Sequence, residues 1–186
     1  TVNTCPIIAV SQRVDRVAGR DECRDALDQS LIAWVVKLGG LPLPVPNMLG
    51  DCLPGWLDAM SPSAVLLSGG NDIGEIPERD RTEATLLKYA VRSDLPVLGI
   101  CRGMQMLVHY AGGTLVPVIG HAGTRHVLQG DLVAAGELAA EVNSFHDWGV
   151  NVCPPQYNIL ATAADGLIEL IRHNTFRWEG WMWHPE

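Results

Sequence analysis

Short apolar runs alternate with helix-like segments through residues 5–110, and this alternation constrains the fold more than any other feature of the chain. The strand-like runs are 5–10, 41–46, 63–70 and 95–100, and the segments with helical spacing are 24–40, 53–60, 81–93 and the stretch after residue 101. Strands that alternate with helices pair in parallel and are covered on both sides. We therefore predict an α/β fold with a mostly parallel central sheet and helices on both faces.

The second half is richer in strand patterns, with short runs at 126–130, 149–152, 158–163 and 167–173. The length of 186 residues, 47% of them hydrophobic, suits one domain with a real core, so we assign residues 1–186 to a single domain. The sequence stops at Glu186 directly after a strand-like exit. A terminal helix is absent there, so we expect the natural chain to continue beyond this residue.

Charge and cysteine content exclude several classes of protein. The formal net charge of −8 disfavours nonspecific binding to nucleic acid or to an anionic membrane. No apolar run is long enough to span a membrane, and the start lacks a leader pattern, so we expect a cytoplasmic protein. Five scattered cysteines without a CxxC pair indicate neither a disulfide framework nor a metal cage, and we expect no cofactor and no metal.

The stretch "LGICRGMQML" places Cys101 between two glycines where a strand-like run gives way to a helical pattern. Gly99 and Gly103 would permit the sharp strand-to-helix turn of a nucleophile elbow. The helix start would also favour a thiolate through its unpaired N–H groups and dipole. A buried structural cysteine in a glycine turn explains the motif equally well when it is taken alone.

A nucleophile needs a base and an orienting group. Of six histidines only His184 has a carboxylate two residues later, in "WMWHPE". Strand alternation would put Met182, His184 and Glu186 on one face and the flanking tryptophans on the other. We predict that His184 is the base and Glu186 its orienter, although the motif alone also fits an exposed strand end.

Oxyanion donors are the third requirement of such chemistry. The strand-like run "LLSGGND" ends in a glycine pair with accessible backbone amides, and a second amide directly follows the nucleophile. We predict that the N–H groups of Gly70 and Arg102 form the oxyanion hole. Taken alone, the glycine pair also fits an ordinary turn.

In this order, "GICRGMQ", "LSGG" and "WHPE" resemble the class I glutamine amidotransferase family, with Cys101, His184 and Glu186 matching its catalytic triad. The resemblance implies a flavodoxin-like architecture. The segments at 24–47, "LSGGND", "MQMLVHYAGGTL" and "EVNSFHDWGV" are most similar to the γ-glutamyl hydrolase branch, peptidase C26, which includes γ-glutamyl-γ-aminobutyrate hydrolases.

The resemblance implies that Cys101 attacks a γ-glutamyl carbonyl, that a thioester forms and that water releases glutamate. It also implies glutamyl contacts at six positions: Gly69, Gln105, Asn143, Ser144, Phe145 and His146. Where γ-aminobutyrate-releasing members have paired histidines, this chain has His146-Asp147, which weakens the transfer of that substrate. "AVSQRV", "RDALD" and "VNSFHDWGV" are similar to γ-glutamyl-CDP-amidate hydrolases of capsule phosphoramidate synthesis.

Four arginines crowd one stretch of this acidic protein: Arg13, Arg16, Arg20 and Arg24. Guanidinium groups bind diphosphates through paired hydrogen bonds, so Arg13 and Arg24 are candidates to hold an anionic leaving group. The interleaved acidic residues Asp15, Asp21, Glu22 and Asp25 favour the alternative, a solvated charged face.

Three functions stay open: a free-standing γ-glutamyl hydrolase, a glutaminase subunit that passes ammonia to a separate synthase, and a non-catalytic protein with Cys101 as a redox sensor. His121 and His126 fit either the rim of the pocket or a polar surface. The expected partner is a small γ-glutamyl substrate. The oligomeric state is open, a homodimer included.

Overall fold

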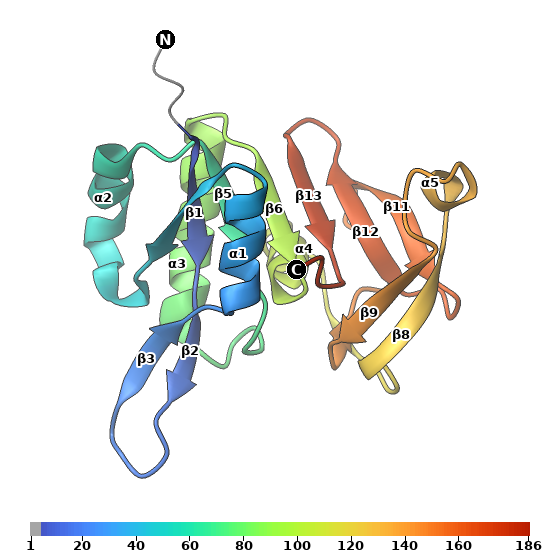
Figure 1. The fold of residues 1–186 in the computed structure, drawn as a ribbon, viewed down its shortest axis with the longest axis horizontal. Helices are drawn as coiled ribbons and strands as arrows, with labels where there is room; N and C mark the ends of the chain where they lie inside the picture. The colour runs from blue at the N-terminus through green and yellow to red at the C-terminus, as the bar shows by residue number, and fades with distance from the viewer. Residues whose placement is uncertain (1–4) are drawn as a thin grey trace. The chain divides into compact units, whose positions relative to one another are not determined.

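The computed structural model describes residues 5–186, which form two compact units (Figure 1). The first unit takes in the described residues up to Val97 together with Glu186, and the second runs from Leu98 to Pro185. Each unit is described by itself below. The assignment of the chain to a single domain stays a prediction.

The first unit contains a parallel sheet in the order β4-β1-β5. In the middle strand, Ala9 and Val10 are fully buried, whereas β4 carries two prolines, as the sequence predicted for an edge strand. Its elements are β1 (Ile7–Ser11), β2 (Arg13–Arg16), β3 (Cys23–Ala26), α1 (Gln29–Lys37), β4 (Leu41–Val45), η1 (Asn47–Cys52), α2 (Leu53–Met60), β5 (Ala64–Leu67) and α3 (Pro77–Arg92).

Helices cover both sides of these strands, with α1 in front and α3 behind in the view of Figure 1. The side chain of Asp28 caps α1 by accepting a hydrogen bond from the Ser30 N–H, and the helix buries Leu31 and Val35. Helix α3 begins with a proline in its first turn and buries apolar residues that include Leu86 and Leu87. The predicted α/β class is therefore confirmed.

The helix predicted for 24–40 starts later than expected, because residues 23–26 form β3 instead. This strand pairs with β2 in an antiparallel hairpin. The carboxylate of Asp25 accepts hydrogen bonds from the backbone and side-chain N–H groups of Asn47, at 2.9 and 2.7 Å. This long-range tie holds the segment extended and leaves the helix to begin after its cap at Asp28.

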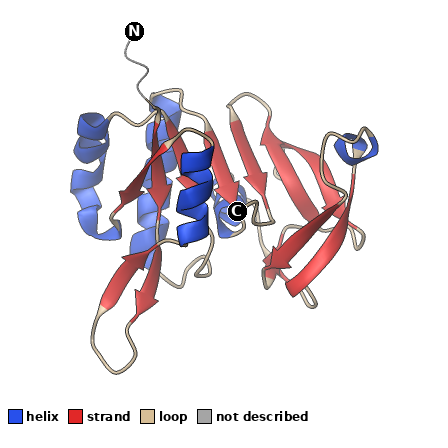
Figure 2. Cartoon of the chain, in the orientation of Figure 1, coloured by secondary structure: helices blue, strands red, loops and turns tan. Residues whose placement is uncertain are grey.

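The second unit is built mostly from antiparallel strands (Figure 2). They follow the order β6-β13-β12-β11-β8-β9 and bury a core of Leu128, Val142, Ala161, Leu170 and Trp183. The elements are β6 (Val97–Ile100, whose first residue belongs to the first unit), α4 (Arg102–Tyr110), β7 (Val116–Pro117), β8 (Ala122–Gln129), α5 (Asp131–Ala134), β9 (Glu141–Phe145), β10 (Trp148–Gly149), β11 (Tyr157–Ala163), β12 (Ile168–His173) and β13 (Trp178–Trp181).

One predicted strand, 149–152, is largely wrong. Only Trp148–Gly149 pairs, as β10 with β7. Val150 is fully buried, and its carbonyl accepts a hydrogen bond from the Ile168 N–H at 2.9 Å. This contact directs the chain toward β12 and ends the short ladder.

None of the helices described in residues 5–186 is long and apolar enough to cross a membrane. The longest, α3, has 16 residues and carries charged side chains throughout.

We predict that Gly99→Ala destabilises the fold. A Cβ atom at this position would lie 2.5 Å from the carbonyl carbon and oxygen of Gly103 and 2.7 Å from the Met104 nitrogen. Backbone atoms cannot yield as a side chain can, so the expected loss is about 3 kcal/mol.

Gly55→Ala is the matched control, because Gly55 lies exposed in α2 and a Cβ there meets nothing within 4 Å. It is expected to gain about 0.5–1 kcal/mol from helix propensity. Urea unfolding measures both free energies of unfolding, and equal stability of the two variants would contradict the packing argument.

Candidate active site

Cys101 sits at the sharp turn that joins β6 to α4. Its backbone has φ 52° and ψ −108°, a conformation that non-glycine residues rarely adopt. The Cys101 N–H donates to the Trp181 carbonyl at 2.7 Å, and the Gln105 N–H donates to the Cys101 carbonyl at 3.2 Å. The geometry is that of the predicted elbow, and backbone contacts on both sides hold it.

Arg102 is the first residue of α4, where the N–H groups point out of the N-terminus of the helix. A negative charge that develops beside Cys101 would face this positive end of the helix dipole. The Arg102 amide is therefore well placed for its predicted role as an oxyanion donor, a role that stays a prediction.

His184 is fixed through its backbone by a side chain 41 residues away. The Nδ2 of Asn143 donates to the His184 carbonyl, and the His184 N–H donates to the Oδ1 of Asn143, both at 2.8 Å. The amide of Asn143 thus takes the place of a neighbouring strand. This explains why β13 stops at Trp181, whereas strand alternation was predicted through Glu186.

The rings around this segment point in two directions. Trp181 and Trp183 stack with their centroids 5.5 Å apart, which confirms that they share a face. The imidazole of His184 meets the exposed ring of Phe145 edge to face, with the centroids at 5.8 Å. Asn143 and Phe145, both on β9, therefore position the backbone and the ring of the candidate base.

In the first unit, a buried arginine organises the glycine loop that follows β5. The guanidinium of Arg79 donates to the carbonyls of Ser68 at 2.7 Å, Gly69 at 3.0 Å and Gly70. Its charge is balanced by Glu83 at 3.1 Å, and both side chains are fully buried. The sequence patterns did not single out Arg79, because its partners are backbone carbonyls several residues away.

This network sets the direction of the Gly70 amide. The carbonyl and N–H of a trans peptide point in opposite directions, so the bond from Arg79 to the Gly69 carbonyl turns the Gly70 N–H away from Arg79. Gly70 has φ 81°, which a side chain would strain. A Cβ added to Gly70 would lie 3.1 Å from the guanidinium of Arg13, so Arg13 packs against the predicted oxyanion donor.

The other arginines lie on the hairpin or its turn and have acidic neighbours. Arg13 pairs with Asp15 at 2.8 Å, and Glu22 contacts Arg24 at 2.6 Å and Arg20 at 3.7 Å. These side chains are about half exposed or more, except for Glu22 at 38%. The hairpin thus has the interleaved charges of a solvated face, but only Arg13 is also placed against Gly70.

Several predicted substrate contacts are engaged with protein groups. Gln105 is buried, and its Nε2 donates to the Trp148 carbonyl at 3.0 Å. Ser144 is fully buried, and its hydroxyl has no hydrogen-bond partner among the described residues. The structure brings the elbow and the His184 segment together in the second unit, and it places Gly69, Gly70, Arg13, Arg24 and Glu186 in the first. The roles of these residues stay predictions.

The remaining histidines of interest are not on the surface. His121 is buried and His126 partly buried, and both lie close to His146 and Glu169. Burial lowers the pKa of His126, and the Glu169 carboxylate opposes this effect only in part. Burial raises the pKa of Asp165, but hydrogen bonds from His121 and the Leu167 N–H outweigh it and leave the pKa below its usual value.

Comparison with known proteins gives consistent matches. Residues 6–186 match the family model described as peptidase C26. The γ-glutamyl-γ-aminobutyrate hydrolase of Escherichia coli O157:H7 is 28% identical, over 97% of this chain and 85% of that protein. The γ-glutamyl-CDP-amidate hydrolase of Campylobacter jejuni is 32% identical over 66% of this chain, but the match spans only 62% of that protein.

A solved structure of a glutamine amidotransferase from Thermotoga maritima has the same fold. Its TM-score is 0.68 with 15% identity, and the match covers 97% of this chain and 76% of that one. At this identity the likeness concerns the fold alone.

We predict that Asn143→Ala destabilises the protein by about 2 kcal/mol, because it removes two hydrogen bonds worth about 0.5–1.5 kcal/mol each from the His184 backbone. Asn151→Ala is the control, since Asn151 lies in an exposed bend, and it should change stability by less than about 0.5 kcal/mol. Thermal unfolding compares the variants. If both melt like the parent protein, Asn143 does not hold the His184 segment.

Proposed function

Since the chain belongs to the peptidase C26 family, we propose that it is a cysteine-dependent hydrolase of γ-glutamyl amide bonds. The observation that carries the proposal is the backbone of Cys101, held at φ 52° between β6 and the N-terminus of α4. A strained residue at a strand-to-helix turn presents its side chain for attack and places its oxyanion donors beside it. A purely structural cysteine gains nothing from this strain.

In the proposed reaction, the Cys101 thiolate attacks the γ-carbonyl carbon of the substrate and the carbonyl oxygen becomes an oxyanion. The N–H groups of Gly70 and Arg102 stabilise that charge. The C–N bond then breaks, and His184 protonates the departing amine, which leaves a glutamyl thioester on Cys101. Water, deprotonated by His184, attacks the thioester and releases glutamate and the free thiol. Glu186 orients His184 in this scheme.

Intact-protein mass spectrometry tests the nucleophile. Incubation with a γ-glutamyl amide is expected to give a glutamyl adduct that disappears in Cys101→Ala but persists in Cys52→Ala, since Cys52 is exposed and lies on no elbow. His184→Ala should lower the hydrolysis rate by about 10²–10⁴-fold, the usual contribution of a general acid-base residue. An adduct that survives in Cys101→Ala would overturn the assignment of the nucleophile.

The leaving amine is the second part of the proposal, and an anionic, nucleotide-bearing amine is our choice. The matching C. jejuni hydrolase acts on γ-glutamyl-CDP-amidate, and Arg13 lies against Gly70, next to where the scissile carbonyl would bind. A guanidinium there would attract a diphosphate. The E. coli relative suggests γ-aminobutyrate as the alternative leaving amine.

The two arginines distinguish these substrates. Arg13→Ala is expected to raise KM for a nucleotide-bearing γ-glutamyl amide by about tenfold, the loss of one charge-assisted hydrogen bond, and to leave a plain γ-glutamyl amide unchanged. Arg24→Ala should have a smaller effect, because Glu22 holds its guanidinium at 2.6 Å. Equal KM changes for both substrates would remove the anionic leaving group from the proposal.

A glutaminase subunit is the second candidate, favoured by the fold shared with the T. maritima glutamine amidotransferase. Ammonia release from glutamine, measured against amine release from γ-glutamyl conjugates with no other protein present, separates the two. Glutamine turnover that is slow alone and rises with a synthase would replace the hydrolase proposal.

A further inference from the structure

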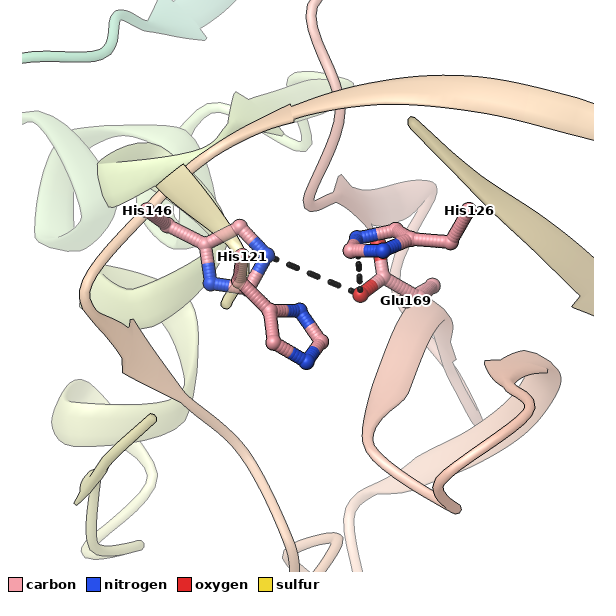
Figure 3. Close-up of side chains that lie close together, drawn as sticks. All are labelled: His121, His126, His146 and Glu169. Carbon is pink, nitrogen blue, oxygen red and sulfur yellow. Dashed lines mark ion pairs between the residues drawn. The ribbon is translucent and has the colours of Figure 1, made fainter. Parts of the chain in front are cut away.

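Four ionisable side chains converge inside the second unit (Figure 3). His121 immediately precedes β8, His126 lies within it, His146 follows β9, and Glu169 belongs to β12. One ligand atom from each residue lies within 4.8 Å of all the others. None of these four residues has a necessary role in the proposed reaction, so the cluster calls for its own explanation.

The polar atoms at the centre of this cluster have no hydrogen-bond partners. They are the Nδ1 of His121, the Nε2 of His126, the Nε2 of His146 and both carboxylate oxygens of Glu169, all of them buried. Glu169 is completely buried and the side chain of His146 is 1% exposed. A buried carboxylate without hydrogen bonds is strongly unfavourable unless a cation lies beside it.

The outer nitrogens show which atoms the rings present to the centre. The Nε2 of His121 lies 2.7 Å from the carboxylate of Asp165, so it carries the proton and leaves a lone pair on the buried Nδ1. The Nδ1 of His146 lies 3.0 Å from the Trp148 carbonyl, so it too carries the proton and leaves the lone pair on Nε2. Histidine ligands of metals have this same arrangement, with the other N–H bound to a carboxylate or carbonyl.

The distances also suit a metal better than hydrogen bonds. The Nε2 atoms of His126 and His146 each lie 3.6 Å from one oxygen of Glu169, too far for a hydrogen bond. The ligands of a tetrahedral ion with bonds of about 2.0–2.2 Å lie about 3.3–3.5 Å from one another. Small rotations of the side chains would bring all four atoms to that spacing.

We propose that His121, His126, His146 and Glu169 form a binding site for a divalent transition-metal ion of the zinc class. Three neutral imidazoles and one carboxylate supply four ligands and compensate the buried charge of Glu169. With no position left open, the ion has a structural role. The cysteine pattern that usually signals a zinc site is absent, and the four ligands come from separated segments, so the sequence did not indicate it.

The proposed ion would brace the segment that carries the candidate base. His146 follows β9, whose Asn143 holds the His184 backbone, and the Glu169 carbonyl accepts a hydrogen bond from the Met182 N–H at 2.9 Å. A metal that links β8, β9 and β12 therefore stabilises both contacts. The site is independent of the reaction proposed above, because metal binding can be measured without any substrate.

The test uses the full chain in a Cys101→Ser background, so that metal bound to that thiol does not count. After removal of metal with a chelator, titration with Zn²⁺ against a competing chromophore is expected to give one tightly bound ion per chain. Saturation should raise the melting temperature by on the order of 10 °C. Co²⁺ should give the visible bands of a tetrahedral site without a sulfur charge-transfer band.

Variants keep the test decisive. His126→Gln and Glu169→Gln are expected to lose the tight site, whereas His109→Gln, an exposed histidine on α4, should keep it. Asp165→Asn leaves the ligands in place but removes the charged partner of His121, and it should weaken binding by about 10–100-fold. Without metal, Glu169→Gln should melt no lower than the parent chain, because a neutral amide is easier to bury than a carboxylate.

Zn²⁺ binding by the parent chain that is no tighter than binding by a His126→Gln, Glu169→Gln double variant would overturn the proposal. So would unchanged binding in Asp165→Asn together with a sulfur band in the Co²⁺ spectrum, because the metal would then occupy another site.

Discussion

The close approach of Gly99 to Gly103 is the constraint on which the candidate active site depends. The end of β6 and the first turn of α4 come so near that no side chain fits at Gly99. The residue between them, Cys101, is consequently held with a positive φ at the N-terminus of a helix. The thiol, the Arg102 amide and the helix dipole all owe their placement to this one backbone contact.

Two buried polar side chains complete what the short motifs begin. Arg79 binds the carbonyls of the loop after β5 and thereby turns the Gly70 amide away from itself. Asn143 pairs with the backbone of His184 and holds a segment that has no strand partner of its own. Neither residue belongs to a motif that suggested catalysis. Each acts through backbone groups, and the chain brings these partners together only when it folds.

The sequence predicted the elements best where a buried apolar run or a regular helical stripe is long enough. Helix α2 lies at the predicted residues 53–60, and the edge position of β4 follows from its two prolines. The start of α1 and the strand expected at 149–152 were wrong, because distant groups compete with the local pattern. Asp25 is tied to Asn47, and the Val150 carbonyl is bound by Ile168.

The amino-acid sequence by itself determined the α/β class and the glycine-flanked cysteine. It also determined the family, because the spacing of glycines, apolar runs and a few polar residues is a local property. Tertiary structure alone decided which polar groups meet. The cluster of His121, His126, His146 and Glu169 is assembled from a loop, two strands and a strand end, and its character depends on burial. Burial removes water from these groups and leaves their charges and lone pairs to be compensated inside the protein. A one-dimensional pattern does not record that.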